Sequence, residues 1–333
     1  MKRIILLFLV GSIIISCKVT SETKSAGSIE RLDPALDNII DRDATIEVLA
    51  EGYQWSEGPV WIDKKEMLLF SDVPKNTIYK WTEKNGAEVY LTPSGYTGTE
   101  PSQSREPGSN GLTLNAAGHL ILCQHGDRRV ARLNTDLDEP KPVFVTLADR
   151  FEGKRFNSPN DAVVRKNGDI FFTDPPYGLP QQENDTTKDI KFQGVYKIAT
   201  SGAVSLLVDS LTRPNGIALT PDEKTLIVAN SDPAKAVWYA FDLIDGETIS
   251  NPRILFDATE KAKTDKGLPD GLKIDSQGNI FATGPGGVWI FSAEGKLLGK
   301  IKVPEATANC ALTADEKTLF LTSHSSLLRI KMR

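Results

Sequence analysis

Short apolar runs alternate with polar turns along most of the chain, and the same order of runs returns about every 50 residues. Each repeat opens with a short apolar stretch, passes through a polar turn and continues as two further strand-like runs. The first of these further runs covers residues 67–70, 119–122, 169–172, 226–228, 279–282 and 319–321. The second covers residues 77–81, 130–133, 194–198, 237–241, 288–291 and 327–330. Repeated short strands of this kind predict the blades of a β-propeller.

The last of the six repeats ends the chain before an outer strand can form. The run 45–49, upstream of the first repeat, has the composition of a strand and is predicted to supply the missing one. Pairing the two ends in one blade closes the ring and removes an open sheet edge. The sequence therefore predicts an all-β, six-bladed propeller over residues 32–333, closed by an N-terminal strand.

Five repeats begin with an oxygen-bearing side chain at the same position, and we call these residues the heads. They are Glu57, Asn110, Asn160, Asn215 and Asp270. Since the innermost strand of each blade lines the central channel, the heads are expected to converge around its axis. Carboxylate and carboxamide oxygens suit Ca²⁺, Mg²⁺ or Mn²⁺ better than a structural zinc. The alternative is that Asn-Gly and Asp-Gly are only favourable turn sequences at strand entrances.

In the sixth repeat, alignment on the turn at residues 312–319 places Ala308 at the head position. That repeat is therefore expected to lack a polar head.

The formal net charge of −5 argues against a surface that gathers nucleic acid phosphates.

The N-terminus has the pattern of an export signal. Basic residues 1–3 precede an apolar run over 4–15 that ends at Cys17, which looks like a bacterial lipoprotein processing site. Residues 1–17 are predicted to be a signal peptide with Cys17 lipidated, and residues 18–31 a flexible tether. The protein is then expected to be exported and held at a bacterial membrane by its lipid. The alternatives are an ordinary signal peptide cut elsewhere and an uncleaved anchor.

Beyond the repeat, the chain resembles the SMP-30/gluconolactonase/LRE-like family from about Leu32 to the C-terminus. The resemblance rests on EGPVW at 57–61, CQHGDRRV at 123–130, NSPND at 157–161, FTDPPYG at 172–178, RPNG at 213–216 and PDG at 269–271. It implies that Glu57, Asn215 and Asp270 bind one divalent cation, with Asn160 as a further ligand directly or through water. Ca²⁺ is the expected ion, with Zn²⁺, Mn²⁺ and Mg²⁺ as alternatives. Asn110 is placed beside the metal as a substrate contact.

The same resemblance implies hydrolysis of a sugar lactone, in which the cation polarises the carbonyl and a carboxylate activates water. Asp270 is the first candidate for the base and Asp161 the second, although Asp161 is equally suited to a structural turn. Asn160 and His125 are candidates for substrate contacts, and the alternative for His125 is a loop residue that fixes its own turn. A deep polar channel mouth with Asp161 and His125 turned inward would favour an enzyme.

Two features depart from the regucalcin branch of that family. Ser158 stands where that branch has an arginine that contacts sugar-like substrates, and the polar insert 180–192 is expected to shape the rim of the site. The reaction class is thus better defined than the substrate. A non-catalytic propeller that binds a sugar or protein, and an esterase or organophosphate hydrolase on the same site, remain alternatives. The oligomeric state is not fixed by the sequence.

Overall fold

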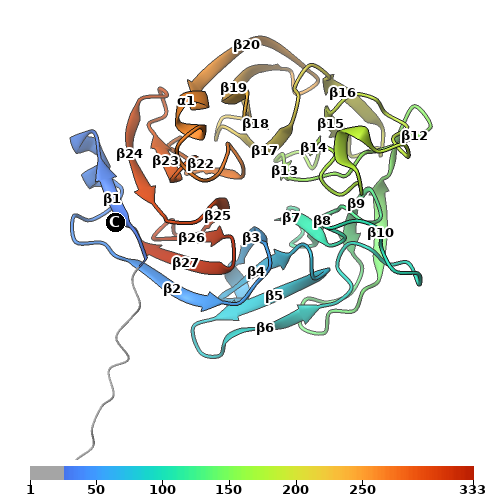
Figure 1. Cartoon of the computed structure of the whole chain (residues 1–333), viewed down its shortest axis with the longest axis horizontal. Coiled ribbons are helices and arrows are strands. Elements are labelled where there is room, and N and C mark those ends of the chain that lie inside the picture. The colour runs from blue at the N-terminus through green and yellow to red at the C-terminus, as the bar shows by residue number, and fades with distance from the viewer. Residues whose placement is uncertain (1–25) are drawn as a thin grey trace, which may run out of the picture.

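The protein forms a ring of six β-sheets around a central channel, and residues 26–333 are described by a computed structural model (Figure 1). Within these residues there is also one two-stranded hairpin, and no helix is long and apolar enough to cross a membrane. The predicted six-bladed propeller is confirmed. The predicted signal peptide, the predicted lipidation site Cys17 and most of the predicted tether lie outside the described residues.

The first four blades follow one another along the chain. Blade one consists of β3 (Ser56–Ile62), β4 (Met67–Asp72), β5 (Thr77–Thr82) and β6 (Gly86–Leu91). Blade two consists of β7 (Ser109–Leu114), β8 (Leu120–Gln124), β9 (Arg129–Leu133) and β10 (Phe144–Ala148). Blade three consists of β13 (Ala162–Val164), β14 (Ile170–Asp174), β15 (Gly194–Ile198) and β16 (Val204–Val208). Blade four consists of β17 (Pro214–Leu219), β18 (Thr225–Asp232), β19 (Lys235–Ile244) and β20 (Thr248–Asp257).

Blades five and six each include a strand from the N-terminal part of the chain. Blade five consists of β21 (Leu272–Ile274), β22 (Ile280–Gly284), β23 (Gly287–Phe291), β24 (Leu297–Lys302) and the added strand β1 (Ser28–Arg31). Blade six consists of β25 (Thr307–Leu312), β26 (Thr318–Ser323), β27 (Ser326–Lys331) and β2 (Ile46–Glu51). The hairpin is β11 (Arg150–Phe151) with β12 (Lys154–Arg155), and the short helices are η1 (Pro34–Asn38), η2 (Asp63–Lys65), η3 (Gln182–Asn184) and α1 (Thr259–Ala262).

The ring closes as predicted, because β2 pairs antiparallel with β27 and places Ile46 opposite Ile330. The predicted tether, by contrast, ends too late in the sequence. β1 pairs with β24, Ser28 opposite Lys302, and so extends blade five outward. This short segment is ordered by backbone hydrogen bonds to β24. It has few apolar side chains, so the pattern of apolar residues did not predict it as a strand.

The apolar core is divided among the spaces between neighbouring blades. Trp238 of blade four packs against Trp289 of blade five, with ring centroids 5.7 Å apart, and both side chains are buried. Burial of one large apolar side chain contributes about 1.5 to 3 kcal/mol. The packing leaves the channel free for the polar residues of the innermost strands.

Register shifts in the innermost strands determine the direction of the head side chains. β3, β7, β17 and β25 each carry a register shift beside the head position, and such bulges redirect side chains. Hydroxyl groups on the second strand of one blade then donate hydrogen bonds to the backbone of the next blade, at its head residue. Ser71 donates to the carbonyl oxygen of Asn110 over 3.0 Å, and Thr173 to that of Asn215 over 2.6 Å.

Two glycines allow the innermost strands to approach closely. A Cβ on Gly58, whose φ is +52°, would lie 2.0 Å from the carbonyl oxygen of Asn110. A Cβ on Gly216 would lie 2.2 Å from that of Asp270. Larger residues would therefore separate neighbouring blades at the level of the heads.

Candidate functional site

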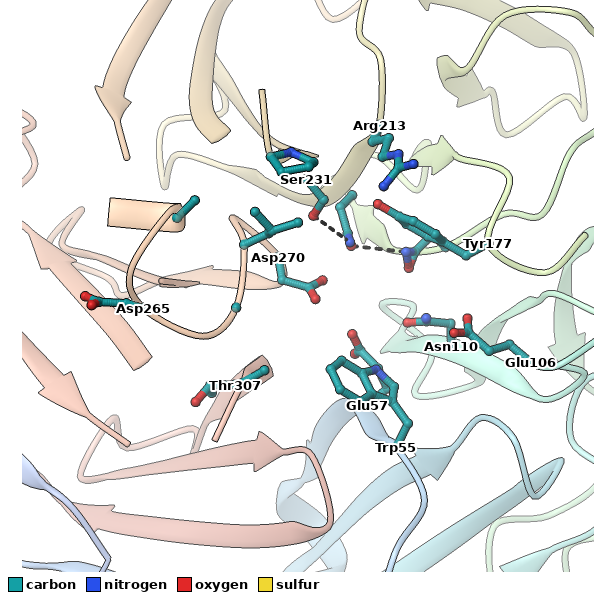
Figure 2. A pocket seen from close by; sticks show the side chains of 17 residues that line it. Trp55, Glu57, Glu106, Asn110, Tyr177, Arg213, Ser231, Asp265, Asp270 and Thr307 are labelled. Carbon is teal, nitrogen blue, oxygen red and sulfur yellow. Dashed lines mark hydrogen bonds between the residues drawn. The ribbon is translucent and has the colours of Figure 1, made fainter. Parts of the chain in front are cut away.

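All five heads line one cavity of ≈ 420 Å³ at a mouth of the channel. The carboxylates of Glu57 and Asp270 and the amide of Asn110 point into its floor (Figure 2). Its walls include aromatic and charged side chains from the loops above the ring. These are Trp55, Glu106, Tyr177, Arg213 and Asp265. The structure thus brings together the head residues that the repeat singled out.

Hydrogen bonds orient the two amides on the far side of the floor. Asn160 Nδ2 donates to Asn215 Oδ1 over 3.1 Å, and Asn215 Nδ2 donates to Ser231 Oγ over 3.1 Å (Figure 2). Ser231 Oγ in turn donates to the carbonyl oxygen of Pro269, next to Asp270. This chain fixes which atom of each amide faces the cavity.

Three head oxygens have no hydrogen-bond partner. They are Oδ1 of Asn110, of Asn160 and of Asp270, each inaccessible to solvent. Buried polar oxygens are nearly always paired, so oxygens left free at one position in three blades are suited to a ligand. Among the described residues, no three His, Cys, Asp or Glu side chains gather as a metal cluster. The head set instead combines two carboxylates with three amides, which are hard oxygen donors.

A second layer of polar residues lies next to the heads. Asn309 is buried and its Nδ2 donates to Glu57 Oε2 over 3.2 Å. Its Oδ1 accepts from Lys273 Nζ over 3.2 Å and from the backbone N–H of Cys310 over 2.9 Å. Asn309 therefore holds the carboxylate of Glu57 and links it to the half-buried ammonium group of Lys273.

The charges of this cluster do not balance. Glu57, Asp161 and Asp270 supply three carboxylates, and Lys273 supplies one ammonium. Burial raises the pKa of Glu57 to about 8, aided by the charge of Asp161 and opposed by a hydrogen bond from the N–H of Gly58. Burial and the charges of Glu57 and Asp161 raise the pKa of Asp270 well above its usual range. When all four groups ionise, two negative charges remain, which matches the charge of one divalent cation.

Two predicted site residues do not line the cavity. Asp161 is buried beside Gly111 and accepts a hydrogen bond from the N–H of Ala162, so it is not placed to face bound water there. His125 is fully buried, and its Nδ1 lies 3.6 Å from Oε2 of Glu106. Glu106, not His125, reaches the cavity surface (Figure 2). The deep polar mouth expected of an enzyme is present, but without these two residues turned into it.

Ser158 also differs in role from the arginine expected at its position. Its hydroxyl donates to the carbonyl oxygen of Pro175 over 2.6 Å and accepts from the N–H of Gly178 over 2.9 Å. It therefore fixes the loop after β14 and does not line the cavity. The cavity receives its guanidinium from Arg213, which pairs at 2.6 Å with Glu183 in the insert.

The sequence contained an unused signal for the second layer. The position after each head is glycine in blades one, two, four and five, but Asp161 in blade three and Asn309 in blade six. Lys273 likewise stands three residues after its head, where the other repeats have Val, Thr or Ala. At these two repeat positions, the residues that differ from the glycine or small residue of the other repeats are the ones next to the heads. Glu106 lies outside the repeat and had no such signal.

Comparison with known proteins assigns the fold to a family. The model of the SMP-30/gluconolactonase/LRE-like region matches residues 55–325. A gluconolactonase from Zymomonas mobilis is 39% identical over 313 residues, covering 92% of this chain and 86% of that protein. A pentonolactonase from Haloferax volcanii is 25% identical over 254 residues, covering 74% and 73% of the two chains. A solved gluconolactonase structure from Xanthomonas campestris superposes with a TM-score of 0.80 at 29% identity, covering 93% and 97%.

The fold and its cavity define a six-bladed β-propeller with a ring of oxygen-bearing side chains at one channel mouth. The chain belongs to the SMP-30/gluconolactonase/LRE-like family.

Proposed function

We propose that this protein is a metal-dependent hydrolase that opens a sugar lactone in the cavity above the heads. The observation that carries the proposal is the set of unpartnered oxygens of Asn110, Asn160 and Asp270 on the floor of that cavity. Relatives named gluconolactonase and pentonolactonase support the same reaction class.

The heads fit a divalent cation in donor type and in charge. Glu57, Asn160, Asn215 and Asp270 would hold it, with Ca²⁺ as the expected ion. Such an ion polarises a bound carbonyl and stabilises negative charge on its oxygen, an effect of several kcal/mol. Asn309 and Ser231 keep Glu57 and Asn215 oriented for that role.

Asp270 is the proposed base. Asp270 lines the cavity and its Oδ1 has no hydrogen-bond partner, so it can accept a proton as a water oxygen attacks the lactone carbonyl. The ring C–O bond then breaks and its oxygen takes up a proton, which gives the open hydroxy acid. Asn110, with a free Oδ1 beside the ring, is placed to orient the water or the substrate.

The test is hydrolysis of D-glucono-1,5-lactone above its spontaneous rate by protein that is metal-stripped and then refilled with Ca²⁺, Mn²⁺, Mg²⁺ or Zn²⁺. We expect metal-restored turnover that Asp270→Asn and Glu57→Gln lose by at least 100-fold while both remain folded. Asp265→Asn is the matched control, since Asp265 lines the same cavity away from the heads. Equal turnover by Asp270→Asn would reject its assignment as the base.

The other reaction classes are separate arms of the same assay. Turnover of p-nitrophenyl acetate or diethyl p-nitrophenyl phosphate, without turnover of any lactone, would replace the lactonase by an esterase or organophosphate hydrolase. Folded, metal-loaded protein that hydrolyses none of these probes would favour the non-catalytic propeller.

Attachment to the cell envelope belongs to the same proposal. The apolar run before Cys17 supports export, followed by lipidation of its thiol. Labelled palmitate should be incorporated into the full-length protein and not into Cys17→Ser. Labelling of both forms, or of neither, would contradict it.

A further inference from the structure

Glu106 is a cavity-wall carboxyl that the ring of heads does not use. It lies in the loop between β6 and β7, beside Asn110 and across from Tyr177 (Figure 2). Among residues 26–333, no side chain donates a hydrogen bond to its carboxyl group within 3.5 Å. His125 lies beside it, with Nδ1 3.6 Å from Oε2 of Glu106. A carboxyl group without donors of its own is suited to accept hydrogen bonds from a ligand.

The loop that carries Glu106 is fixed at both ends. Asn76 Oδ1 accepts the backbone N–H groups of Ser94, Gly95 and Tyr96, which holds the start of the loop. At its end, the N–H of Gly108 donates to the carbonyl oxygen of Val73 over 2.9 Å. These contacts place Glu106 before any ligand arrives, and such preorganisation lowers the cost of binding.

His125 backs the carboxyl from inside the protein. Its side chain is fully buried, and neither ring nitrogen has a hydrogen-bond partner in the described structure. Gly178 presses on it, since a Cβ there would lie 2.6 Å from the Cβ of His125. Burial lowers the pKa of His125 to about 3, so the ring is neutral and can donate one N–H. A separation of 3.6 Å is long for a hydrogen bond, and such contacts commonly tighten when substrate binds.

The charge of the cavity wall indicates which ligands fit. Arg213 is paired with Glu183, so its positive charge is already compensated. With a divalent cation balancing the floor, the wall still carries the carboxyl groups of Glu106 and Asp265. They disfavour carboxylate- or phosphate-bearing ligands, and Glu106, beside Asn110, is placed to accept a hydrogen bond from a hydroxyl group of the ligand.

We propose that Glu106, positioned by His125, binds a hydroxyl group of a neutral polyhydroxylated lactone and selects such lactones over unsubstituted or anionic ones. This inference rests on the proposed lactone hydrolysis and names the substrate class for that site. Glu106 is a specificity residue here, and His125 acts only through it.

The experiment compares D-glucono-1,5-lactone with δ-valerolactone, which has the same ring and no hydroxyl groups, on full-length metal-loaded protein. We expect Glu106→Ala to lower kcat/KM for the hydroxylated lactone by about 10- to 100-fold, mainly through KM. Its kcat/KM for δ-valerolactone and its cation affinity should stay within about twofold. Glu100→Ala, an exposed glutamate of the same loop, is the control and should change neither.

Variants at position 125 test the positioning role. His125→Leu should reproduce part of the KM effect on the hydroxylated lactone, and His125→Gln, which keeps an N–H donor, should restore it. Equal losses on both lactones for Glu106→Ala would assign the residue to the reaction or the fold and overturn the inference. No change on either lactone would overturn it as well.

A binding measurement separates this inference from the proposed reaction. If the parent protein hydrolyses neither lactone, the proposed function fails, and the cyclic polyol 1,5-anhydro-D-glucitol becomes the probe in calorimetry. Binding to the parent that Glu106→Ala weakens tenfold or more supports the hydroxyl contact. Equal binding to both proteins, or binding to neither, rejects it.

Discussion

Replacement of Asn309 by Ala should weaken cation binding although Asn309 is not a proposed ligand. The change removes the hydrogen bond to Glu57 Oε2 and the one from Lys273 Nζ, each 3.2 Å long. Both involve charged groups, for which the contribution is about 1.5 to 3 kcal/mol each. The free energy of unfolding should therefore fall by roughly 3 kcal/mol or more. Glu57 also loses its orientation, and loss of such a supporting contact lowers metal affinity by about 10- to 100-fold.

Calorimetric titration of metal-stripped protein with Ca²⁺, together with urea unfolding, measures both effects. Thr322→Val is the matched control, because Thr322 is equally buried and donates only to the carbonyl oxygen of Asn309 over 3.3 Å. It should cost about 1 kcal/mol of stability and leave the cation affinity unchanged. If Asn309→Ala binds the cation like the parent while Glu57→Gln does not, the supporting role of Asn309 is refuted.

Two further predictions concern pH and ring closure. The pKa values of Glu57 and Asp270 are raised in the cation-free protein, so protons compete with the cation below about pH 8. As the pH is lowered, the cation affinity should therefore fall by up to about tenfold per pH unit for each proton that the cation displaces. Titrations between pH 5.5 and 8.5 in buffers of different ionisation enthalpy would show this, and a pH-independent affinity would contradict the ligand set. Ile46→Asp places a charge in the buried seam between β2 and β27 and should lower the free energy of unfolding by about 3 kcal/mol or more. The control Val89→Asp changes an exposed residue of β6 and should lower the free energy of unfolding by less than about 0.5 kcal/mol. Equal urea midpoints for these two variants would show that the seam does not support the ring.

The blades were predictable because each one repeats the same alternation of strands and turns. Strand order, the closing role of residues 45–49 and the position of the heads follow from that period. For Asn309 the sequence carried one signal, a polar residue where four repeats have glycine, but that signal did not fix the direction of its side chain. A regular strand sends successive side chains to opposite faces, but β25 has a register shift between Thr307 and Asn309. The direction of Asn309 therefore depends on an irregularity that the pattern does not record.

The walls of the cavity were less predictable than its floor. Glu106 lies in a loop without periodicity, and contacts with residues outside the loop, such as Asn76, fix that loop. His125 was recognised as unusual, but its depth depends on Gly178, 53 residues later in the sequence, which covers it. Residue type suggested chemistry in both cases. Placement relative to the surface required the packed structure.

The seam between β2 and β27 sets the order in which the protein can finish folding. β2 is the second and β27 the last of the described strands, with Ile46 paired to Ile330. Contacts so distant in sequence form slowly, because the entropy of closing a very long loop is lost before the strands pair. Five blades can therefore assemble while β2 is still unpaired, because its partner β27 follows them in the sequence. During that interval β2 of one molecule is an equally good partner for β27 of another, so concentrated refolding should favour strand-exchanged oligomers over closed rings.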